Sequence, residues 1–306
     1  MDYRWVAVDF GGPEVLRRVE VDVPDPGHGQ VRINVRASGM NPADAKHIAP
    51  GQDRSLLPLT IGFEVSGVVS AAGGGAGFAT GDDVVTRVSG GYATAVTVPA
   101  PDVYRKPAAL TFPEAANLLL VATTAADLLH TSGASAGQTI LLHGAAGAVG
   151  VSVLQQARLL GVQVIGTASP ANFAFVERFG GVPVEYGPGL LDRVRGAAPE
   201  GVDAALDTVG SGEAGDVSLV LVKDRSRVVT IADAPRAKAD GYVFVGASNP
   251  ASAPFRAHAA PRIVAMAAAG DLIVPMAATF AFHDAPAAFA MLTSPHPPGK
   301  IALTRE

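Results

Sequence analysis

A turn rich in small residues between two apolar segments is the part of this sequence most suited to chemistry. Residues 139–143 form a short apolar run typical of a buried parallel strand. Residues 144–150 follow at once with the sequence Gly-Ala-Ala-Gly-Ala-Val-Gly, then residues 151–160 show helical apolar spacing and residues 162–167 resemble a second strand. Small residues at a helix start let backbone N–H groups approach a pyrophosphate, whose charge the helix dipole favours. The turn therefore predicts dinucleotide binding.

The turn differs at one position from the usual G-x-G-x-x-G pattern. Ala145 stands at the first glycine position, whereas Gly147 and Gly150 occupy the other two. The alternative is a tight strand-to-helix turn in which small residues serve packing alone. The strand–turn–helix–strand context favours dinucleotide binding, because the pattern is meaningful only in that setting.

Composition limits both the fold and the partners. With 306 residues, of which 48% are hydrophobic, the chain is expected to form two domains. The net charge is -5 and the basic residues are scattered, so no nucleic-acid partner is expected. No apolar run reaches the ~18–20 residues of a membrane span, and the N-terminus lacks a signal-peptide pattern. We expect a cytoplasmic protein without a membrane partner.

Cysteine and histidine usage argues against common metal sites. The chain has no cysteine, which excludes disulfides, thiolate metal ligands and cysteine nucleophiles. The seven histidines show no i, i+4 pair, so no metal site is predicted.

The texture of the sequence changes near residue 111. Short β segments separated by Gly, Pro and Asp turns fill residues 1–110 and predict a β-barrel or sandwich. Residues 113–129 look helical, and alternating β and α segments then predict an α/β fold with a doubly wound parallel sheet. Its expected strands are 139–143, 162–167, 182–186, 203–207 and 227–232, and its expected helices are 149–160, 171–179 and 213–222. A loop is expected at residues 247–262, followed by a helix at 262–269, a strand at 276–280, a helix at 286–292 and a strand at 301–304.

Several motifs occur in a characteristic order along the chain. They are residues 12–16 (Gly-Pro-Glu-Val-Leu), 38–44 (Ser-Gly-Met-Asn-Pro-Ala-Asp), 62–69 (Gly-Phe-Glu-Val-Ser-Gly-Val-Val), 81–84, 90–93, 207–210 (Asp-Thr-Val-Gly) and 299–300 (Gly-Lys). On these motifs the chain resembles the medium-chain dehydrogenase/reductase superfamily, in its zinc-free quinone oxidoreductase branch. Zinc-dependent relatives carry a histidine where Phe63 stands and a cysteine within residues 39–44, which this chain lacks.

The resemblance implies a division into two domains. A GroES-like catalytic domain would span residues 1–112 and be completed by residues 263–306, and a Rossmann NADP-binding domain would span residues 113–262. The active site is expected in the cleft between them. A homodimer is expected by resemblance only.

Two residues are the candidates for catalysis. The resemblance places Asn41 beside the nicotinamide, and Pro42 holds it extended; an Asx turn is the alternative. The Lys46 ammonium could bond a developing enolate oxygen or help deliver a proton, although a solvated lysine is an equal alternative.

The end of the second strand bears on the choice of nicotinamide cofactor. The second strand ends with Thr167-Ala168-Ser169, and the next acidic residue is Glu177. An NAD site usually has an acid at the end of this strand to bind the ribose hydroxyls, so NADP(H) is favoured. The resemblance implies that Ser169, Asn172 and Tyr186 contact the 2′-phosphate, with turn and helix-cap roles as the alternative for the first two. The other cofactor-binding candidates are Asn41, Thr124, Ala146, Gly147, Ala148, Val149, Thr167, Ile231, Ala232, Phe244, Val245 and Lys300. Core packing is the alternative for the apolar ones, a bond to its own helix for Thr124, and a surface position for Lys300. His143 is expected to be a satisfied core histidine.

These expectations converge on hydride transfer without a metal. An electron-poor C=C accepts a hydride more easily than an unpolarised carbonyl does, because charge spreads onto a conjugated oxygen. The expected function is therefore NADPH-dependent reduction of a quinone or an α,β-unsaturated carbonyl compound. An enoyl-thioester reductase, and a sensor or interaction protein that binds NADPH without turnover, stay open as alternatives.

Overall fold

The computed structural model describes residues 1–246 and 249–305 of the chain, and they fold into two units. Unit 1 comprises Met1–Leu120 and Val264–Glu306, and unit 2 comprises Val121–Ile263. The expected boundary at residue 112 lies inside unit 1. No helix of the described residues is long and apolar enough to cross a membrane.

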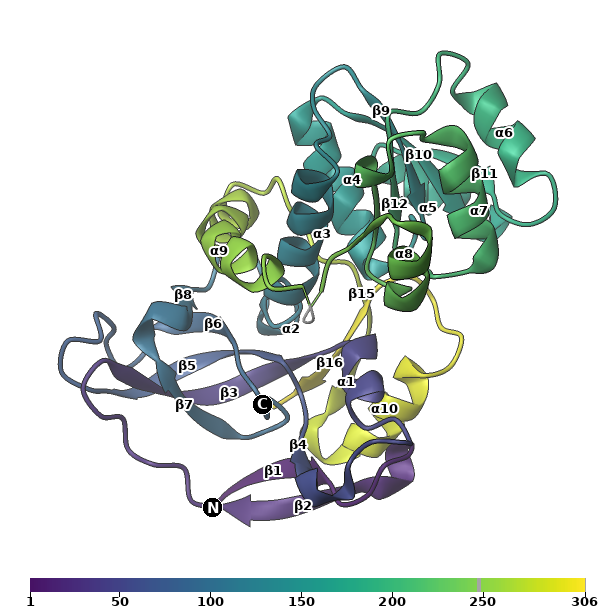
Figure 1. The fold of residues 1–306 in the computed structure, drawn as a ribbon. Coiled ribbons are helices and arrows are strands. Elements are labelled where there is room, and N and C mark those ends of the chain that lie inside the picture. The colour runs from purple at the N-terminus through teal and green to yellow at the C-terminus, as the bar shows by residue number, and fades with distance from the viewer. Residues whose placement is uncertain (247–248, 306) are drawn as a thin grey trace. The chain divides into compact units, whose positions relative to one another are not determined.

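Unit 2 contains a parallel sheet that, within the described residues, has six strands in the order β11-β10-β9-β12-β13-β14 (Figure 1). Its strands are β9 (Thr139–His143), β10 (Gln163–Ala168), β11 (Val182–Glu185), β12 (Ala204–Asp207), β13 (Val228–Thr230) and β14 (Val243–Phe244). The chain runs outward from β9 to β11 and then outward from β12 to β14, so the strand order reverses between β9 and β12. This is the predicted doubly wound arrangement, which creates a crevice beyond the carboxyl ends of the two central strands.

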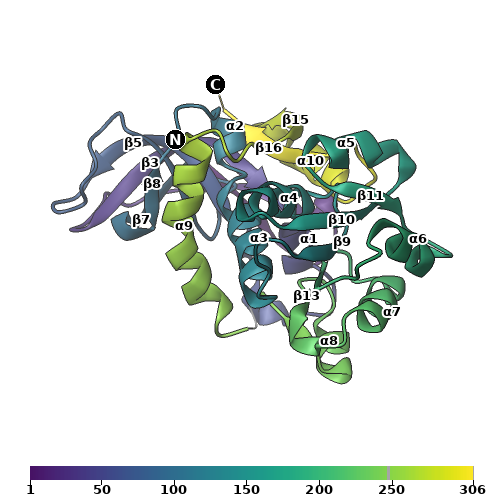
Figure 2. The ribbon, with the colours of Figure 1, turned by 90° about the horizontal axis from the view of Figure 1, so that it is seen from above.

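Helices cover both faces of the sheet because its strands are apolar on both faces. The helical elements between residues 119 and 268 are α3 (Leu119–Thr131), α4 (Ala148–Leu160), η4 (Pro170–Asn172), α5 (Phe173–Arg178), α6 (Leu190–Ala197), α7 (Gly212–Leu221), η5 (Arg225–Arg227), α8 (Ala234–Asp240) and α9 (Ser252–Ala268). Figures 1 and 2 show α3 and α4 on one side of the sheet and α6 and α7 on the other. Ile140 and Leu142 of β9 pack into the core that contains α4, whereas Leu141 packs into the core that contains α6 and α7. Successive side chains of a strand point to opposite faces, so this one apolar run supplies both cores.

Two helical expectations are wrong in detail. The expected helix 113–129 is two helices, α2 (Phe112–Ala115) and α3, because the backbone between them changes to the tighter bonds from Asn117 N to Glu114 O at 3.1 Å and from Leu118 N to Ala115 O at 3.2 Å. Residues 252–262, expected in a loop, form the first part of α9. Pro254 suggested a loop, but it lies in the first helical turn, where its missing N–H breaks no helical bond. Residues 247–248 of that expected loop lie outside the described residues.

Unit 1 contains a small sheet and a larger one. The small sheet has the order β2-β1-β4, and the larger has the order β15-β16-β3-β5-β6-β8, with β7 also paired to β3. The strands are β1 (Asp2–Ala7), β2 (Leu16–Val21), β3 (Gln30–Met40), β4 (Leu59–Thr60), β5 (Glu64–Ala72), β6 (Asp83–Arg87), β7 (Ala95–Pro99), β8 (Val103–Arg105), β15 (Met276–Ala281) and β16 (Lys300–Thr304). The short helices are η1 (Pro13–Val15), α1 (Pro42–His47), η2 (Arg54–Leu56), η3 (Ala100–Asp102), η6 (Phe282–Asp284) and α10 (Ala285–Leu292).

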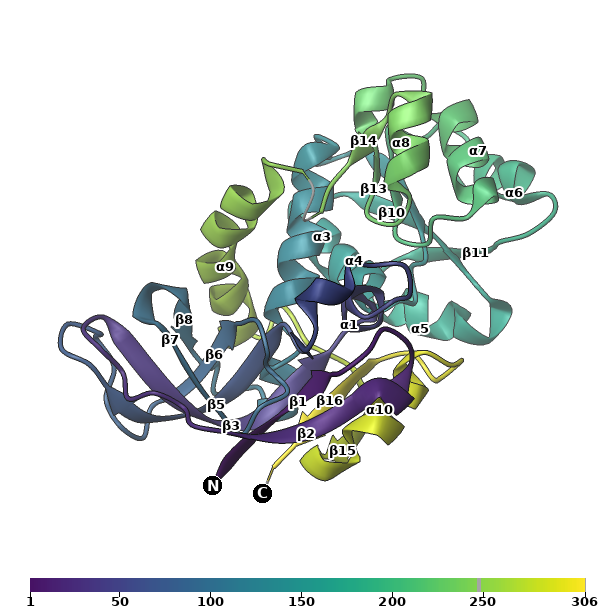
Figure 3. The same ribbon diagram turned by 60° about the horizontal axis from the view of Figure 1, so that its bottom comes forward.

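The two ends of the sequence meet in unit 1. Figure 3 shows the C-terminal elements β15, α10 and β16 beside β1 and β2. Strand β16 pairs antiparallel with β3, and Trp5 of β1 donates its indole N–H to Phe282 O at 2.8 Å. Helix α2 packs against β3, β5 and β16, so residues 112–115 belong to this unit. The C-terminal segment is therefore part of the unit 1 core.

Candidate functional site

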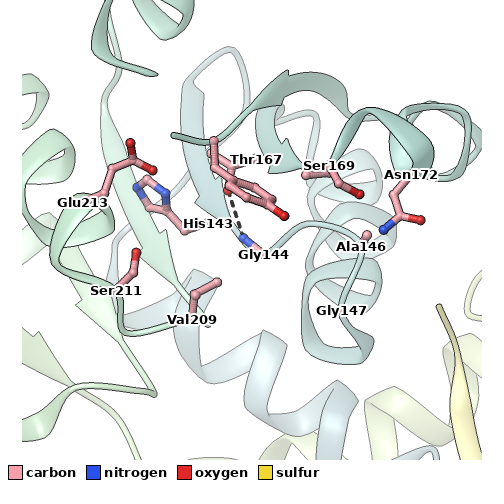
Figure 4. A pocket seen from close by; sticks show the side chains of 12 residues that line it. His143, Gly144, Ala146, Gly147, Thr167, Ser169, Asn172, Val209, Ser211 and Glu213 are labelled. Carbon is pink, nitrogen blue, oxygen red and sulfur yellow. Dashed lines mark hydrogen bonds between the residues drawn. The ribbon is translucent and has the colours of Figure 1, made fainter. Parts of the chain in front are cut away.

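Unit 2 contains a cavity of about 450 Å³ at the carboxyl edge of its parallel sheet (Figure 4). The lining residues follow or end β9, β10, β11 and β12, or begin α4 and α7. They are His143, Gly144, Ala146, Gly147, Thr167, Ala168, Ser169, Asn172, Tyr186, Val209, Ser211 and Glu213. The cavity thus lies at the point where the strand order reverses, which is where open α/β sheets bind their ligands.

The glycine turn leaves the start of α4 accessible to an anion. Gly144 has a φ of +79°, a conformation that favours glycine, and Gly147 is the N-cap residue of α4 with no side chain to cap the helix. A Cβ on Gly150 would lie 2.2 Å from Gly144 O, so only glycine allows the turn to pack this closely on α4. The N–H groups of the first turn of this 13-residue helix can therefore bind a ligand phosphate.

Neutral polar groups line one side of the cavity. Ser169 and Asn172 follow β10, and Tyr186 follows β11 with 56% of its surface exposed. No lysine or arginine is among the described residues that line the cavity. A phosphate on this side would therefore be held by hydroxyl, amide and backbone donors rather than by a cation.

Glu213 and Ser211 lie at the start of α7, on another side of the cavity. Glu213 Oε2 accepts a hydrogen bond from Gly187 N at 2.8 Å, which ties α7 to the segment after β11. Ser211 caps the helix, because its hydroxyl oxygen accepts from Ala214 N at 3.2 Å. An acidic side chain is thus held in place next to the cavity.

His143 ends β9 beneath the cavity and is only 2% exposed. Its Nε2 lies 3.1 Å from Ser218 Oγ. Burial lowers the pKa of His143 to about 4, although Asp207 and Glu213 act in the opposite direction. The imidazole is therefore neutral near pH 7 and adds no positive charge to the site.

Most cofactor candidates of unit 2 are found at or near this cavity. Ala146, Gly147, Thr167, Ser169, Asn172 and Tyr186 line it, and Ala148 and Val149 form the first turn of α4. Thr124 is buried on α3, while Ile231 and Ala232 follow β13 and Phe244 and Val245 lie at β14. These last five residues do not line the cavity.

Asn41 and Lys300 belong to a buried polar cluster in unit 1. Lys300 Nζ donates to Met40 O at 2.6 Å and to Asn41 Oδ1 at 2.5 Å. Asn41 Nδ2 donates to Glu64 Oε1 at 2.9 Å, and Glu64 Oε2 accepts from Leu120 N at 2.9 Å. These bonds fix the orientation of the Asn41 amide, because its oxygen faces an ammonium and its nitrogen faces a carboxylate.

Asp44 and Tyr92 complete the cluster. Asp44 Oδ2 accepts from Asn41 N at 2.7 Å and from Tyr92 OH at 2.9 Å, but none of the described residues hydrogen-bonds its Oδ1. Burial raises the pKa of Asp44 to about 7, although these two hydrogen bonds and Lys300 oppose the shift. Burial also raises the pKa of Glu64 and lowers the pKa of Lys300.

The two catalytic candidates differ in their surroundings. Asn41 is 1% exposed and engaged in the cluster, whereas Lys46 lies exposed in the last turn of α1. Within unit 1, Asn41 therefore holds the buried polar cluster together, whereas Lys46 lies outside this cluster.

Comparisons with known proteins agree with this architecture. Residues 27–108 match the alcohol dehydrogenase GroES-like domain, and residues 184–303 match the zinc-binding dehydrogenase domain. A mycobacterial protein solved in complex with NADPH is 30% identical with a TM-score of 0.85, and the alignment covers 100% of both chains. A quinone oxidoreductase from Pseudomonas syringae pv. tomato DC3000 is 28% identical with a TM-score of 0.85 over 100% of both chains.

The chain belongs to the medium-chain dehydrogenase/reductase superfamily. Within it the chain is quinone oxidoreductase-like: the human quinone oxidoreductase is 41% identical over 167 residues, which are 52% of this chain and 50% of that protein. The chain thus spans about half the length of the curated quinone oxidoreductases that it matches.

The residues present do not fit the zinc ion that one family description names. The chain has no cysteine, and Phe63 precedes Glu64 where zinc-dependent relatives are expected to have a histidine. The buried carboxylates of Asp44 and Glu64 face the Lys300 ammonium, which already supplies the local positive charge. No step of the function below passes through a metal.

Proposed function

We propose that this protein is an NADPH-dependent oxidoreductase that reduces a quinone or an activated C=C bond without a metal. The observation that carries the proposal is the cavity at the strand-order reversal, with an uncapped helix start and a glycine turn at its base. The NADPH complex of the mycobacterial relative and the quinone oxidoreductases among the relatives support it.

In this proposal different residues of the cavity bind different parts of the cofactor. The N–H groups at the start of α4 bind the pyrophosphate, while the Ser169 and Tyr186 hydroxyls and the Asn172 amide bind the 2′-phosphate. Thr167 Oγ1 accepts from Gly144 N at 3.1 Å and so stabilises the turn rather than the ligand. The absence of an acid at the end of β10 removes a charge that would repel the 2′-phosphate.

The bound nicotinamide supplies a hydride, and the protein has to orient the cofactor and exclude water. A quinone that takes up the hydride and one proton would leave as a hydroquinone, an α,β-unsaturated carbonyl compound would take the hydride at its β-carbon and the proton at its α-carbon, and NADP⁺ would remain in either case. No buried acid in unit 2 is assigned to that proton, and we propose water as its source. A small-molecule substrate and a homodimer are part of the proposal on family resemblance, and a cytoplasmic location is part of it on the sequence pattern alone.

Exchanging Gly147 for Asp tests the cofactor site, with Gly147→Asn as a matched control. Asp and Asn are both good N-cap residues, so both variants should keep α4 and fold. They have the same size but differ in charge, and like charges ~4 Å apart repel by roughly 4 kcal/mol at an effective dielectric of 20. NADPH titration should therefore show binding at least about tenfold weaker for Gly147→Asp than for Gly147→Asn. Equal NADPH affinity of the wild type and Gly147→Asp would show that NADPH does not bind at the start of α4.

A further inference from the structure

The cavity in unit 2 has two chemically different sides, and this difference bears on the ligand that the proposed function assigns to it. Figure 4 shows Ser169 and Asn172 on one side, His143, Ser211 and Glu213 on the other, and the turn from Gly144 to Gly147 between them. With the pyrophosphate on the turn, the adenosine half of a dinucleotide phosphate still has its 2′-phosphate and its adenine base to place.

Charge decides which part goes to which side. Glu213 carries a negative charge, and His143 is neutral near pH 7 because burial lowers its pKa to about 4. A 2′-phosphate carries about -1.5 to -2 charges and would be repelled by the Glu213 carboxylate. The phosphate therefore goes to the neutral donors Ser169 and Asn172, and the uncharged base goes to the Glu213 side.

The Glu213 side also offers an apolar surface. Val209 lines the cavity directly after β12 and is 55% exposed, which makes it one of the most exposed large apolar side chains of unit 2. A flat purine that covers Val209 would remove this apolar surface from water, which favours binding. The side of the cavity that repels phosphate is thus suited to an aromatic base.

Glu213 is held so that its carboxylate can bind the edge of that base. Its Oε2 accepts from Gly187 N at 2.8 Å, and an ionised carboxylate has further acceptor positions and no donor. Adenine presents one exocyclic amino group, a donor, at its 6-position. We propose that Glu213 accepts a hydrogen bond from this amino group and makes the site selective for adenine over hypoxanthine dinucleotides.

The experiment compares two reduced dinucleotide phosphates, NADPH and its hypoxanthine analogue, which has an oxygen in place of the 6-amino group. A hydrogen bond to a charged group contributes about 1.5–3 kcal/mol, so the wild type should bind NADPH about tenfold or more tighter than the analogue. Glu213→Gln keeps an oxygen for Gly187 N and adds an N–H₂ donor for the new oxygen. This variant should bind the two dinucleotides within about threefold of one another.

Glu177→Gln is the matched control, because it removes the same charge from an exposed position on α5 outside the cavity. It should keep the wild-type preference for adenine. Equal binding of both dinucleotides by the wild type would overturn the proposal. So would an unchanged preference in Glu213→Gln, since a group other than Glu213 would then distinguish the two bases.

The outcome also separates this inference from the proposed function on which it rests. If the wild type binds neither dinucleotide, the cofactor site itself is wrong and both proposals fail. If it binds NADPH and loses it in Gly147→Asp but shows no preference for adenine, only the role of Glu213 is wrong.

Discussion

Asp44 is an ionisable side chain in the core of unit 1. It is fully buried on α1, and its Oδ2 accepts from Asn41 N and Tyr92 OH. The hydrogen bonds and Lys300 favour the carboxylate, whereas burial favours the neutral acid. Burial has the larger effect, so the pKa of Asp44 rises to about 7. The protonation state of this residue therefore depends on pH within the physiological range.

Replacing Asp44 by Asn should change how stability depends on pH. Folded Asp44 keeps a proton between about pH 4 and pH 7 that the unfolded chain releases, so its contribution to the free energy of unfolding is greatest below that window. That contribution falls by up to about 1.4 kcal/mol for each pH unit and is constant above pH 7. The stability of the wild type relative to Asp44→Asn should therefore fall from pH 5 to pH 7.

Trp5, the only tryptophan of the chain, lies in the core of unit 1 and reports its unfolding in urea by fluorescence. Asp25→Asn is the control, because the Asp25 side chain is 94% exposed. A plot of its free energy of unfolding against pH should run parallel to that of the wild type. If the free energy of unfolding of Asp44→Asn also varies with pH in parallel with that of the wild type, the raised pKa of Asp44 is wrong.

At the residue scale, sequence reasoning found the cavity residues that belong to a known pattern and missed those that do not. Gly147 could be predicted because phosphate binding restricts residue size at a helix start. Glu213 was missed because an acid in the first turn of a helix is common, and only the fold brings α7 to the segment after β11. The partners of Lys300 were equally hidden, since its bond to Asn41 joins residues 259 positions apart.

The element that matters most for the site is the turn that joins β9 to α4. A Cβ on Gly150 would lie 2.2 Å from Gly144 O and 2.8 Å from the Ala145 Cα, and both of these are backbone atoms. Neither atom can move without opening the turn. The packing of this element therefore determines where the N–H groups of α4 point.

Gly150→Ala should destabilise the protein by about 1–3 kcal/mol and weaken NADPH binding, because the turn has to shift to admit the methyl group. Gly196→Ala in α6 is the matched control, since a Cβ there has no heavy atom within 4 Å. Alanine is the better helix former, so this control should leave the melting temperature equal or slightly higher and NADPH binding unchanged. Thermal unfolding followed by circular dichroism and NADPH titration would measure both effects. Wild-type behaviour of Gly150→Ala would contradict the close packing of the turn.

At the element scale, the buried strands could be predicted from short apolar runs, but several helices could not. Helix α8 was missed although its ends are marked in the sequence, since Asp233 accepts from Arg236 N at 3.1 Å and Gly241 ends it with a φ of +73°. Helix α9 was placed too late because prolines suggested a loop. Its early part is held by tertiary contacts, an ion pair of 2.8 Å between Arg256 and Asp127 and the stacking of Phe255 on His130.

On the scale of the whole molecule, each unit closes its own core. The C-terminal strand β16 completes the larger sheet of unit 1 beside β3, and unit 2 is built from one uninterrupted stretch of the chain. The doubly wound class of unit 2 could be predicted because alternating strands and helices leave few other arrangements. The return of the C-terminus to the first domain could be expected from the family resemblance alone, because strand pairing over more than 260 residues leaves no signal in local patterns.

The central claim is that a dinucleotide bound at the glycine turn of unit 2 delivers its hydride to a quinone or an activated C=C bond. The most direct measurement follows the loss of NADPH absorbance with 1,2-naphthoquinone, in parallel with a trans-2-alkenal and a crotonyl thioester, for the wild type and Gly147→Asp. We expect the wild type to consume one NADPH for each acceptor molecule reduced, with no effect of a metal chelator, and we expect Gly147→Asp to lose the activity. NADPH that binds but is oxidised with none of the three acceptors would contradict this claim, as would activity lost to the chelator and restored by zinc.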